Sequence, residues 1–230
     1  PALRERPGCA AAPCAVIADG IDLAEADAGL AAGRDDARRR LGLFATDLAI
    51  VHVGPLDAEA GVAHLLAAFH ALLRETPTAR LLVAGDGPAR PALEAAAAAL
   101  RLGPFARFLG TLPSPWPLLG ATDVFVLPGV RRGVPLALLQ AMAAGLSIVA
   151  ADGGGAPEVA GAGRGALLVQ PGDSGALARA IADLAGSTAR RRELGALARD
   201  RVATGYRIER SAAALQALYA EALGGPASGG

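Results

Sequence analysis

The chain has 230 residues, 53% of them hydrophobic, and 22 basic residues balance 22 acidic ones. This length and composition suit a globular domain with a full core, and the balanced charge excludes a broad basic surface, so no nucleic-acid partner is expected. No apolar run approaches the ~20 residues of a membrane span, and no signal-peptide pattern opens the chain. We expect a cytoplasmic protein without a transmembrane segment, peripheral attachment to a membrane being the alternative.

The composition along the chain divides it into three parts. Residues 1–14 form a leader or linker rich in Pro and Ala, residues 15–223 form the domain, and "GGPASGG" at 224–230 is a flexible tail. Cys9 and Cys14 lie in the leader without a nearby histidine, so we interpret them as reduced cysteines and expect no metal site. The start at Pro1 fits either a processed Met-Pro terminus or a fragment of a longer protein.

Short apolar runs alternate with longer segments of helical periodicity. The runs are typical of buried parallel strands, which we predict at 49–53, 80–84, 106–110, 123–127, 146–150 and 166–170. Helices are predicted at 61–75, 88–100, 135–144, 174–184, 189–202 and 208–223. This alternation predicts an α/β fold with a Rossmann-like, doubly wound parallel sheet. The last helix is expected at the domain edge, where a partner domain would dock.

Three glycine-rich loops follow predicted strands and lead into predicted helices. They are "VGPLDAEAG" at 53–61, "AGDGP" at 84–88 and "LPGVRRGVP" at 127–135. In a doubly wound sheet, ligands bind at the carboxyl ends of the strands, where free backbone N–H groups and helix N-termini suit an anionic ligand. We therefore expect the loops at Gly54, Gly85 and 129–135 to line one common pocket for a nucleotide diphosphate.

Other candidate motifs carry less information. A P-loop cannot be written because the chain contains no lysine. "GAGRGA" at 161–166 fits a dinucleotide-binding pattern but precedes a strand, so we interpret it as a turn. His64 and His70 fall on different faces of one predicted helix and are interpreted as solvated or satisfied positions. His52, beside the Gly54 loop, is either a core residue or a ligand-facing one.

The order and spacing of several motifs resemble a known family. The motifs are "VIADGID", "VGPLDAEAGVAHLLAAF", "LLVAGDGPARPALEAAA", "FLG", "ATDVFVLPGVRRGVPLALLQAMAAGLSIVAADGGGAPEV" and "GALLVQPGDSGALARAIADL". Together they are similar to the C-terminal, donor-binding half of GT-B glycosyltransferases of family 4, the glycosyl transferases group 1. The resemblance implies a nucleotide-diphosphate sugar as substrate, no cofactor, and retaining transfer without an obligatory metal. It also implies an N-terminal acceptor-binding domain, or a partner transferase, that this chain lacks.

The resemblance assigns donor-binding positions to the three loops. They are Gly54, Gly85, Gly87, Gly129, Arg132, Gly133, Val134 and Gln140. The family usually holds the pyrophosphate with an Arg and a Lys, where this chain has Pro55 and Ala60. Two glutamates of the family, which contact the transferred sugar and the ribose, correspond to Arg132 and Gln140. The active-site motifs are therefore degenerate, and no catalytic residue can be named.

These departures lead to two hypotheses. Loss of two charged contacts, each worth roughly 1.5 kcal/mol or more, implies at least ~100-fold weaker donor or transition-state binding. Gln140 keeps a hydroxyl acceptor but loses charge assistance. Arg131 and Arg132 are either solvated loop charges or, in the case of Arg132, a relocated cation. The chain is then either a donor-binding domain with weakened activity, or a pseudo-glycosyltransferase that acts as a binding or scaffolding partner.

Overall fold

The computed structural model describes residues 15–131, 133, 135–161 and 164–223. Its centre is a six-stranded parallel sheet in the order β3-β2-β1-β4-β5-β6. The strands are β1 (Leu48–Val53), β2 (Ala79–Ala84), β3 (Ala106–Gly110), β4 (Val124–Leu127), β5 (Ser147–Ala151) and β6 (Leu167–Val169). All six predicted strands are present within one or two residues of their expected ends, which confirms the doubly wound α/β fold.

Helices connect the strands. The helices that correspond to predicted ones are α3 (Val62–Leu72), α4 (Arg90–Ala99), α6 (Leu136–Ala143), α8 (Ser174–Gly186), α9 (Thr188–Gly205) and α10 (Ile208–Ala222). The structure adds elements that the sequence analysis did not predict: α1 (Leu23–Leu30), α2 (Arg34–Arg40), η1 (Ala58–Ala60), α5 (Trp116–Ala121) and α7 (Ala156–Ala160). All of the added elements are short, so their sequences show little periodicity.

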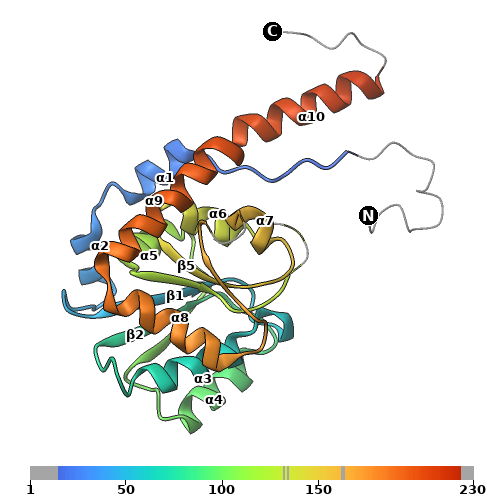
Figure 1. The fold of residues 1–230 in the computed structure, drawn as a ribbon. Helices are drawn as coiled ribbons and strands as arrows, with labels where there is room; N and C mark the ends of the chain where they lie inside the picture. Colours follow the sequence, from blue (N-terminus) through green and yellow to red (C-terminus); the bar gives the residue numbers. More distant parts are fainter. Residues whose placement is uncertain (1–14, 132, 134, 162–163, 224–230) are drawn as a thin grey trace.

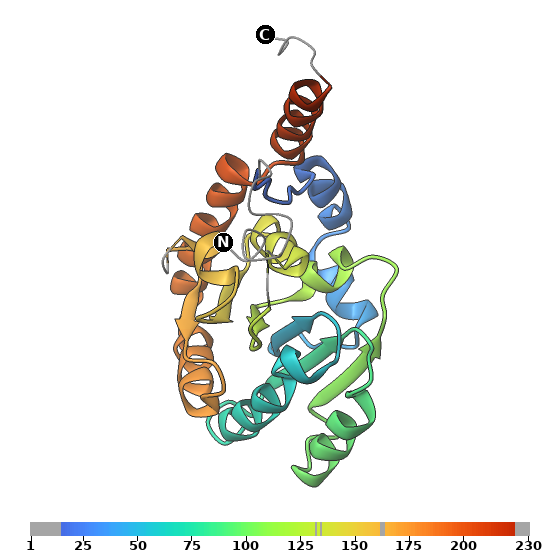
Figure 2. The same cartoon turned by 90° about the vertical axis from the view of Figure 1, so that its right-hand side faces the viewer.

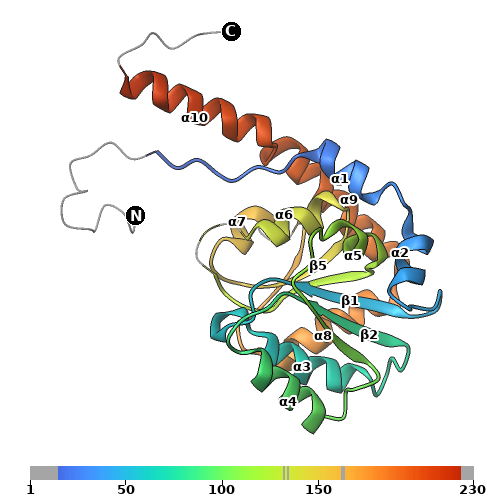
Figure 3. The ribbon, with the colours of Figure 1, turned by 180° about the vertical axis from the view of Figure 1, so that it is seen from behind.

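The sheet separates two hydrophobic cores. Helices α3, α4 and α8 cover one face, and α1, α2, α5, α6 and α7 cover the other, as Figures 2 and 3 show. The first strand β1 supplies both cores: Ala49 and Val51 face one, whereas Leu48 and Ile50 face the other. This burial on both faces explains why the strand sequences are predominantly apolar, without a clean alternation of polar and apolar residues.

The last helix, α10, lies at the domain edge as predicted and extends away from the sheet in Figure 1. None of its residues is buried, and Ile208, Leu215 and Tyr219 are exposed apolar side chains on it. The N-terminal end of α10 is held by the chain that enters the domain: the amide of Ile208 donates to the carbonyl of Ile21, and the Ser211 hydroxyl donates to the carbonyl of Ala18.

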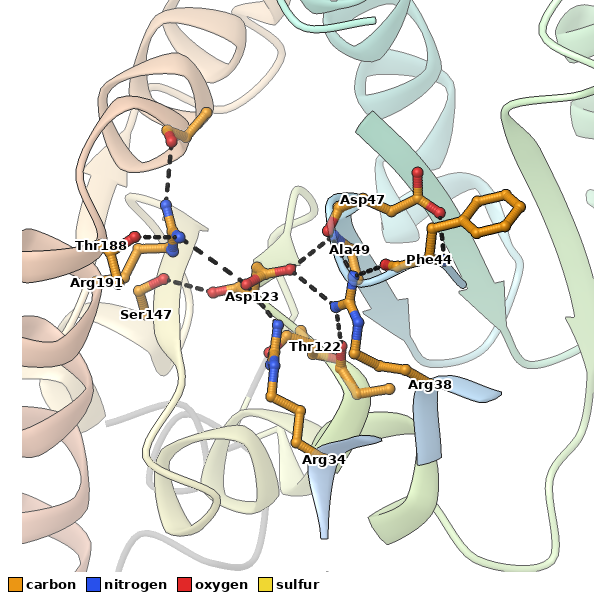
Figure 4. Close-up of polar contacts among 12 residues, drawn as sticks. Arg34, Arg38, Phe44, Asp47, Ala49, Thr122, Asp123, Ser147, Thr188 and Arg191 are labelled. Carbon is orange, nitrogen blue, oxygen red and sulfur yellow. Dashed lines mark hydrogen bonds and ion pairs between the residues drawn. The ribbon is translucent and has the colours of Figure 1, made fainter. Parts of the chain in front are cut away.

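An aspartate holds the amino-terminal ends of two central strands of the sheet together. Asp123, directly before β4, pairs with Arg34 at 2.7 Å and with the buried Arg38 at 3.2 Å, and it accepts a hydrogen bond from the amide of Ala49 (Figure 4). Arg38 also donates to the carbonyls of Phe44, Asp47 and Ala121. This cluster ties α2 to β1 and β4, so it holds the strands whose other ends carry the glycine loops.

Some expectations fall on residues outside the described part of the chain. They concern the leader 1–14 with its two cysteines, the tail 224–230, and positions 162–163 of the "GAGRGA" segment. Gly161, which opens that segment, ends α7 with a φ of +69°, in agreement with the predicted turn.

His64 and His70 are both exposed on α3. Within the described residues, no helix combines the length and apolarity that a bilayer crossing requires.

Candidate nucleotide-sugar site

The three glycine loops meet at the carboxyl ends of the strands, and glycine is required there for the loops to touch. A Cβ on Gly85, whose φ is +131°, would overlap the carbonyl oxygen of Gly54. A Cβ on Gly129 would overlap the carbonyl oxygen of Glu59, and one on Gly87 would overlap that of Leu56. These glycines therefore serve close backbone packing between loops.

The expected common pocket is divided into two adjoining cavities. An inner cavity of about 250 Å³ lies between the first and third loops and is lined by His52, Ala60, Gly129, Arg131 and Pro135 among others. An outer cavity of about 360 Å³ lies beside the second loop and is lined by Gly85, Asp86, Thr111, Leu112 and Gln140 among others. Val53, Gly54 and Pro55 line both cavities, so the first loop is their shared wall.

Arg131 brings a positive charge to the inner cavity. Its guanidinium forms an ion pair with both carboxylate oxygens of Asp57, the shortest contact being 2.8 Å. The same carboxylate caps η1 by accepting from the amides of Glu59 and Ala60. Arg131 is therefore fixed against the first loop, beside position 60, which corrects its interpretation as a solvated loop charge.

His52 is buried in the wall of the inner cavity, with 2% of its surface exposed. Its Nδ1 lies 3.0 Å from the carbonyl oxygen of Val126, so Nδ1 carries a proton and donates. Its Nε2 is buried and has no hydrogen-bond partner among the described residues. Burial is the main reason that the pKa of His52 falls from 6.5 to about 4; the Val126 carbonyl opposes this shift, and the charge of Arg131 adds to it.

The residues assigned from the family resemblance are distributed over both cavities. Gly54 lies between them, Gly129 lines the inner one, and Gly85 and Gln140 line the outer one. Pro55 and Ala60, which replace the expected cations, also line the inner cavity and bring no charge. Gly133, with a φ of +80°, has no atom within 4 Å of a built Cβ. Arg132 and Val134 lie outside the described residues.

Asp86 adds a negative charge to the outer cavity. It accepts hydrogen bonds from the amide of Gly87 at 2.7 Å and from Arg90 at 3.0 Å. These bonds, with that of Gly87 first, hold the pKa of the Asp86 carboxyl below its usual range. Arg90 also pairs with Glu94, so the second loop is anchored to α4 by a short chain of charges.

A larger cavity of about 560 Å³ lies at the amino-terminal edge, beside Arg34, Asp123 and Arg191. Asp123 pairs there with Arg34 at 2.7 Å and with Arg191 at 4.0 Å. Because ligands of doubly wound sheets bind at the carboxyl ends, we place the functional site in the two adjoining cavities instead. Among the described residues, no group of three His, Cys, Asp or Glu side chains is arranged to hold a metal ion.

The strand order and the all-parallel sheet with helices on both faces define a Rossmann-like, doubly wound α/β domain. Residues 47–187 match the family model described as glycosyl transferases group 1, and the chain therefore belongs to that family. Alpha-maltose-1-phosphate synthase of Mycolicibacterium smegmatis is 33% identical over 166 residues, which are 66% of this chain and 42% of that protein. D-inositol 3-phosphate glycosyltransferase of Corynebacterium kroppenstedtii is 29% identical over 218 residues, 90% of this chain and 48% of that protein.

Solved structures agree with the family assignment. Sucrose-phosphate synthase from Thermosynechococcus elongatus is similar with a TM-score of 0.84 and 28% identity, over 97% of this chain and 56% of that one. The C-terminal domain of a group 1 glycosyl transferase, LpcC from Francisella tularensis, has the same fold: its TM-score is 0.71 at 22% identity, and 82% of this chain covers 100% of that one. The chain spans about half the length of the curated relatives it matches, and its fold is that of one GT-B half.

Proposed function

We propose that this chain is the donor-binding part of a glycosyltransferase and binds a nucleotide-diphosphate sugar at the carboxyl edge of its sheet. The observation that carries the proposal is the pair of adjoining cavities, with Gln140 in the outer one and Arg131 in the inner one. In this arrangement the nucleoside occupies the outer cavity beside Gln140, whose amide oxygen accepts a ribose hydroxyl. The diphosphate then crosses the shared wall at Gly54.

A structural relative supports the choice of ligand. HepE of Anabaena, with TM-scores of 0.77 to 0.79 at 21 to 22% identity, has been solved in complex with UDP-glucose and with UDP and glucose. The inner cavity, at about 250 Å³, is smaller than the roughly 300–1,000 Å³ of an ordinary small-molecule site, and the outer one, at about 360 Å³, is near the lower limit of that range. Together they offer room for the two ends of one extended ligand.

Arg131 is the cation that this proposal uses in place of the missing ones. The expected lysine position, Ala60, and Arg131 line the same inner cavity, and both are bonded to the carboxylate of Asp57. The positive charge at this site therefore comes from the third loop, whereas the family pattern places it on the first. Because Asp57 already neutralises Arg131, its attraction for a diphosphate is weaker than that of an unpaired cation, which fits a domain of reduced donor affinity.

The pairing of Arg131 with Asp57 also supports a second candidate function. Leaving-group stabilisation in sugar transfer depends on positive charge fixed at the departing diphosphate. Pro55 and Ala60 supply none, and Arg131 is shared with Asp57. A pseudo-glycosyltransferase would therefore bind nucleoside diphosphates but transfer no sugar when combined with its acceptor-binding partner. The exposed helix α10 is the surface that we propose for such a partner domain or transferase.

The proposed role of Arg131 predicts opposite effects of two substitutions on nucleoside diphosphate binding. Arg131→Ala should weaken affinity about tenfold or more, because a charge-assisted contact contributes ~1.5–3 kcal/mol. Asp57→Asn should strengthen it, because asparagine can still cap η1 while Arg131 is no longer neutralised. The measurement is isothermal titration with UDP, GDP and ADP at fixed ionic strength. Arg74→Ala, which removes an exposed arginine beyond α3, is the control.

A rescue variant tests whether Arg131 takes the place of the cation that the family pattern has at position 60. Ala60→Lys introduced into Arg131→Ala should restore most of the lost affinity, because positions 60 and 131 both line the inner cavity. Introduced into the parent, it should gain less, because two cations would then compete for the same space. Equal affinities of the parent, Arg131→Ala and Asp57→Asn would show that the diphosphate binds elsewhere.

A further inference from the structure

The inner cavity contains a polar atom that the protein leaves without a partner. Nε2 of His52 is buried and unpaired among the described residues, although the ring lines the cavity. The nitrogen faces the first loop, since it lies 3.4 Å from where a Cβ on Gly54 would stand. A buried polar group without a partner costs roughly 1–3 kcal/mol, so a ligand that satisfies it gains that cost back.

The protonation of the ring decides what kind of ligand group can bind. Nδ1 donates to the carbonyl of Val126, so in the neutral ring Nε2 is a hydrogen-bond acceptor. Burial keeps the pKa of His52 near 4, and the neighbouring Arg131 further opposes a second proton. An acceptor cannot bond to the oxygens of an ionised diphosphate, which themselves only accept. It needs a hydroxyl or an amide N–H.

We propose that Nε2 of His52 accepts a hydrogen bond from a hydroxyl of the sugar that the nucleotide carries. This inference rests on the proposed function, because that function places the ribose beside Gln140 in the outer cavity and the diphosphate between Gly54 and Arg131. The wall of the inner cavity at His52 is then left to the transferred sugar. Since Nε2 is closed off from solvent, the hydroxyl reaches it only when part of the wall moves.

His52 thus contributes to selection of the sugar, and the diphosphate is held by other groups. The quantity that isolates this role is the ratio of two affinities, that of a nucleotide sugar over that of its nucleoside diphosphate. The parent should bind UDP-glucose more tightly than UDP. In His52→Phe, which keeps a buried ring but removes the acceptor, this ratio should fall about threefold to tenfold, while the affinity for UDP stays unchanged.

His52→Gln is the second variant, because its amide oxygen can accept the same hydroxyl and should keep part of the ratio. A parent that binds neither UDP, GDP, ADP nor their glucose conjugates overturns this inference and the proposed function together. A parent that binds both ligands, with the same ratio in all three proteins, overturns the role of His52 alone. An equal loss for UDP and UDP-glucose would place the hydroxyl on the ribose and also overturn it. The inference is supported if the ratio of UDP-glucose affinity to UDP affinity falls in His52→Phe and is partly kept in His52→Gln.

Discussion

Replacing Asp123 by alanine should lower the free energy of unfolding by about 3 to 5 kcal/mol. The side chain of Asp123 is 12% exposed and faces Arg38, whose side chain is 4% exposed, so the substitution leaves a buried cation without its counter-ion. It also removes the acceptor of the Ala49 amide and the partner of Arg34. Urea denaturation followed by circular dichroism measures the loss.

Asp36→Ala is the matched control for this experiment. Asp36 also pairs with two arginines, Arg39 and Arg40, but those guanidinium groups are more than two-thirds exposed and lie on the same helix. Exposed pairs of this kind contribute roughly 0.2–1 kcal/mol each. Equal losses in the two variants would contradict the view that the Asp123 cluster anchors the amino-terminal edge of the sheet.

The stability of the parent should fall as the pH is lowered from 6.5 towards 4, and His52 should account for roughly 3 kcal/mol of that fall. The pKa of His52 is about 4 in the folded protein and 6.5 in the unfolded chain. Between these values the unfolded chain binds one more proton than the folded one, so this contribution is fully present above pH 6.5 and is lost towards pH 4. Denaturation midpoints across this range measure it.

Two variants separate His52 from the carboxyl groups that titrate over the same range. In His52→Phe, the slope of unfolding free energy against pH should decrease by up to ~1.4 kcal/mol per pH unit. His70→Phe removes an exposed ring of α3 and should keep the slope of the parent. If the slope of His52→Phe equals that of the parent, the ring of His52 is hydrated in the folded protein, and water reaches it through the inner cavity.

The sequence predicted the sheet well because each strand is buried on both faces. Strand β1, for example, is apolar at five of its six positions, LAIVHV, which is typical of a strand buried on both faces. Helix α2 gave no such signal. Its sequence "RDDARRR" has no apolar stripe, and it is held by Arg38, which reaches Asp123 85 positions away. Contacts of that sequence separation cannot be seen in local periodicity.

The candidate site was predictable in its backbone but less so in its charges. The glycines at 54, 85 and 129 mark the loops correctly, although Gly85 and Gly129 permit contacts between loops. Arg131 was missed because its partner Asp57 is 74 positions away, so the arginine resembled any charge in a polar loop. For His52, the position beside Gly54 was informative, but only the structure shows that one nitrogen is bonded and the other is not.

The central claim is that the two adjoining cavities at the carboxyl edge bind a nucleotide sugar, and mapping of backbone amides by NMR tests it most directly. Titration of the 15N-labelled chain with UDP-glucose should shift the amides of Gly54, Gly85, Arg131 and Gln140 together, with one common dissociation constant. The amides of Asp123 and Arg191, at the opposite edge, should stay in place. Shifts confined to that opposite edge, or no shifts with any of the UDP, GDP and ADP sugars, would contradict the account.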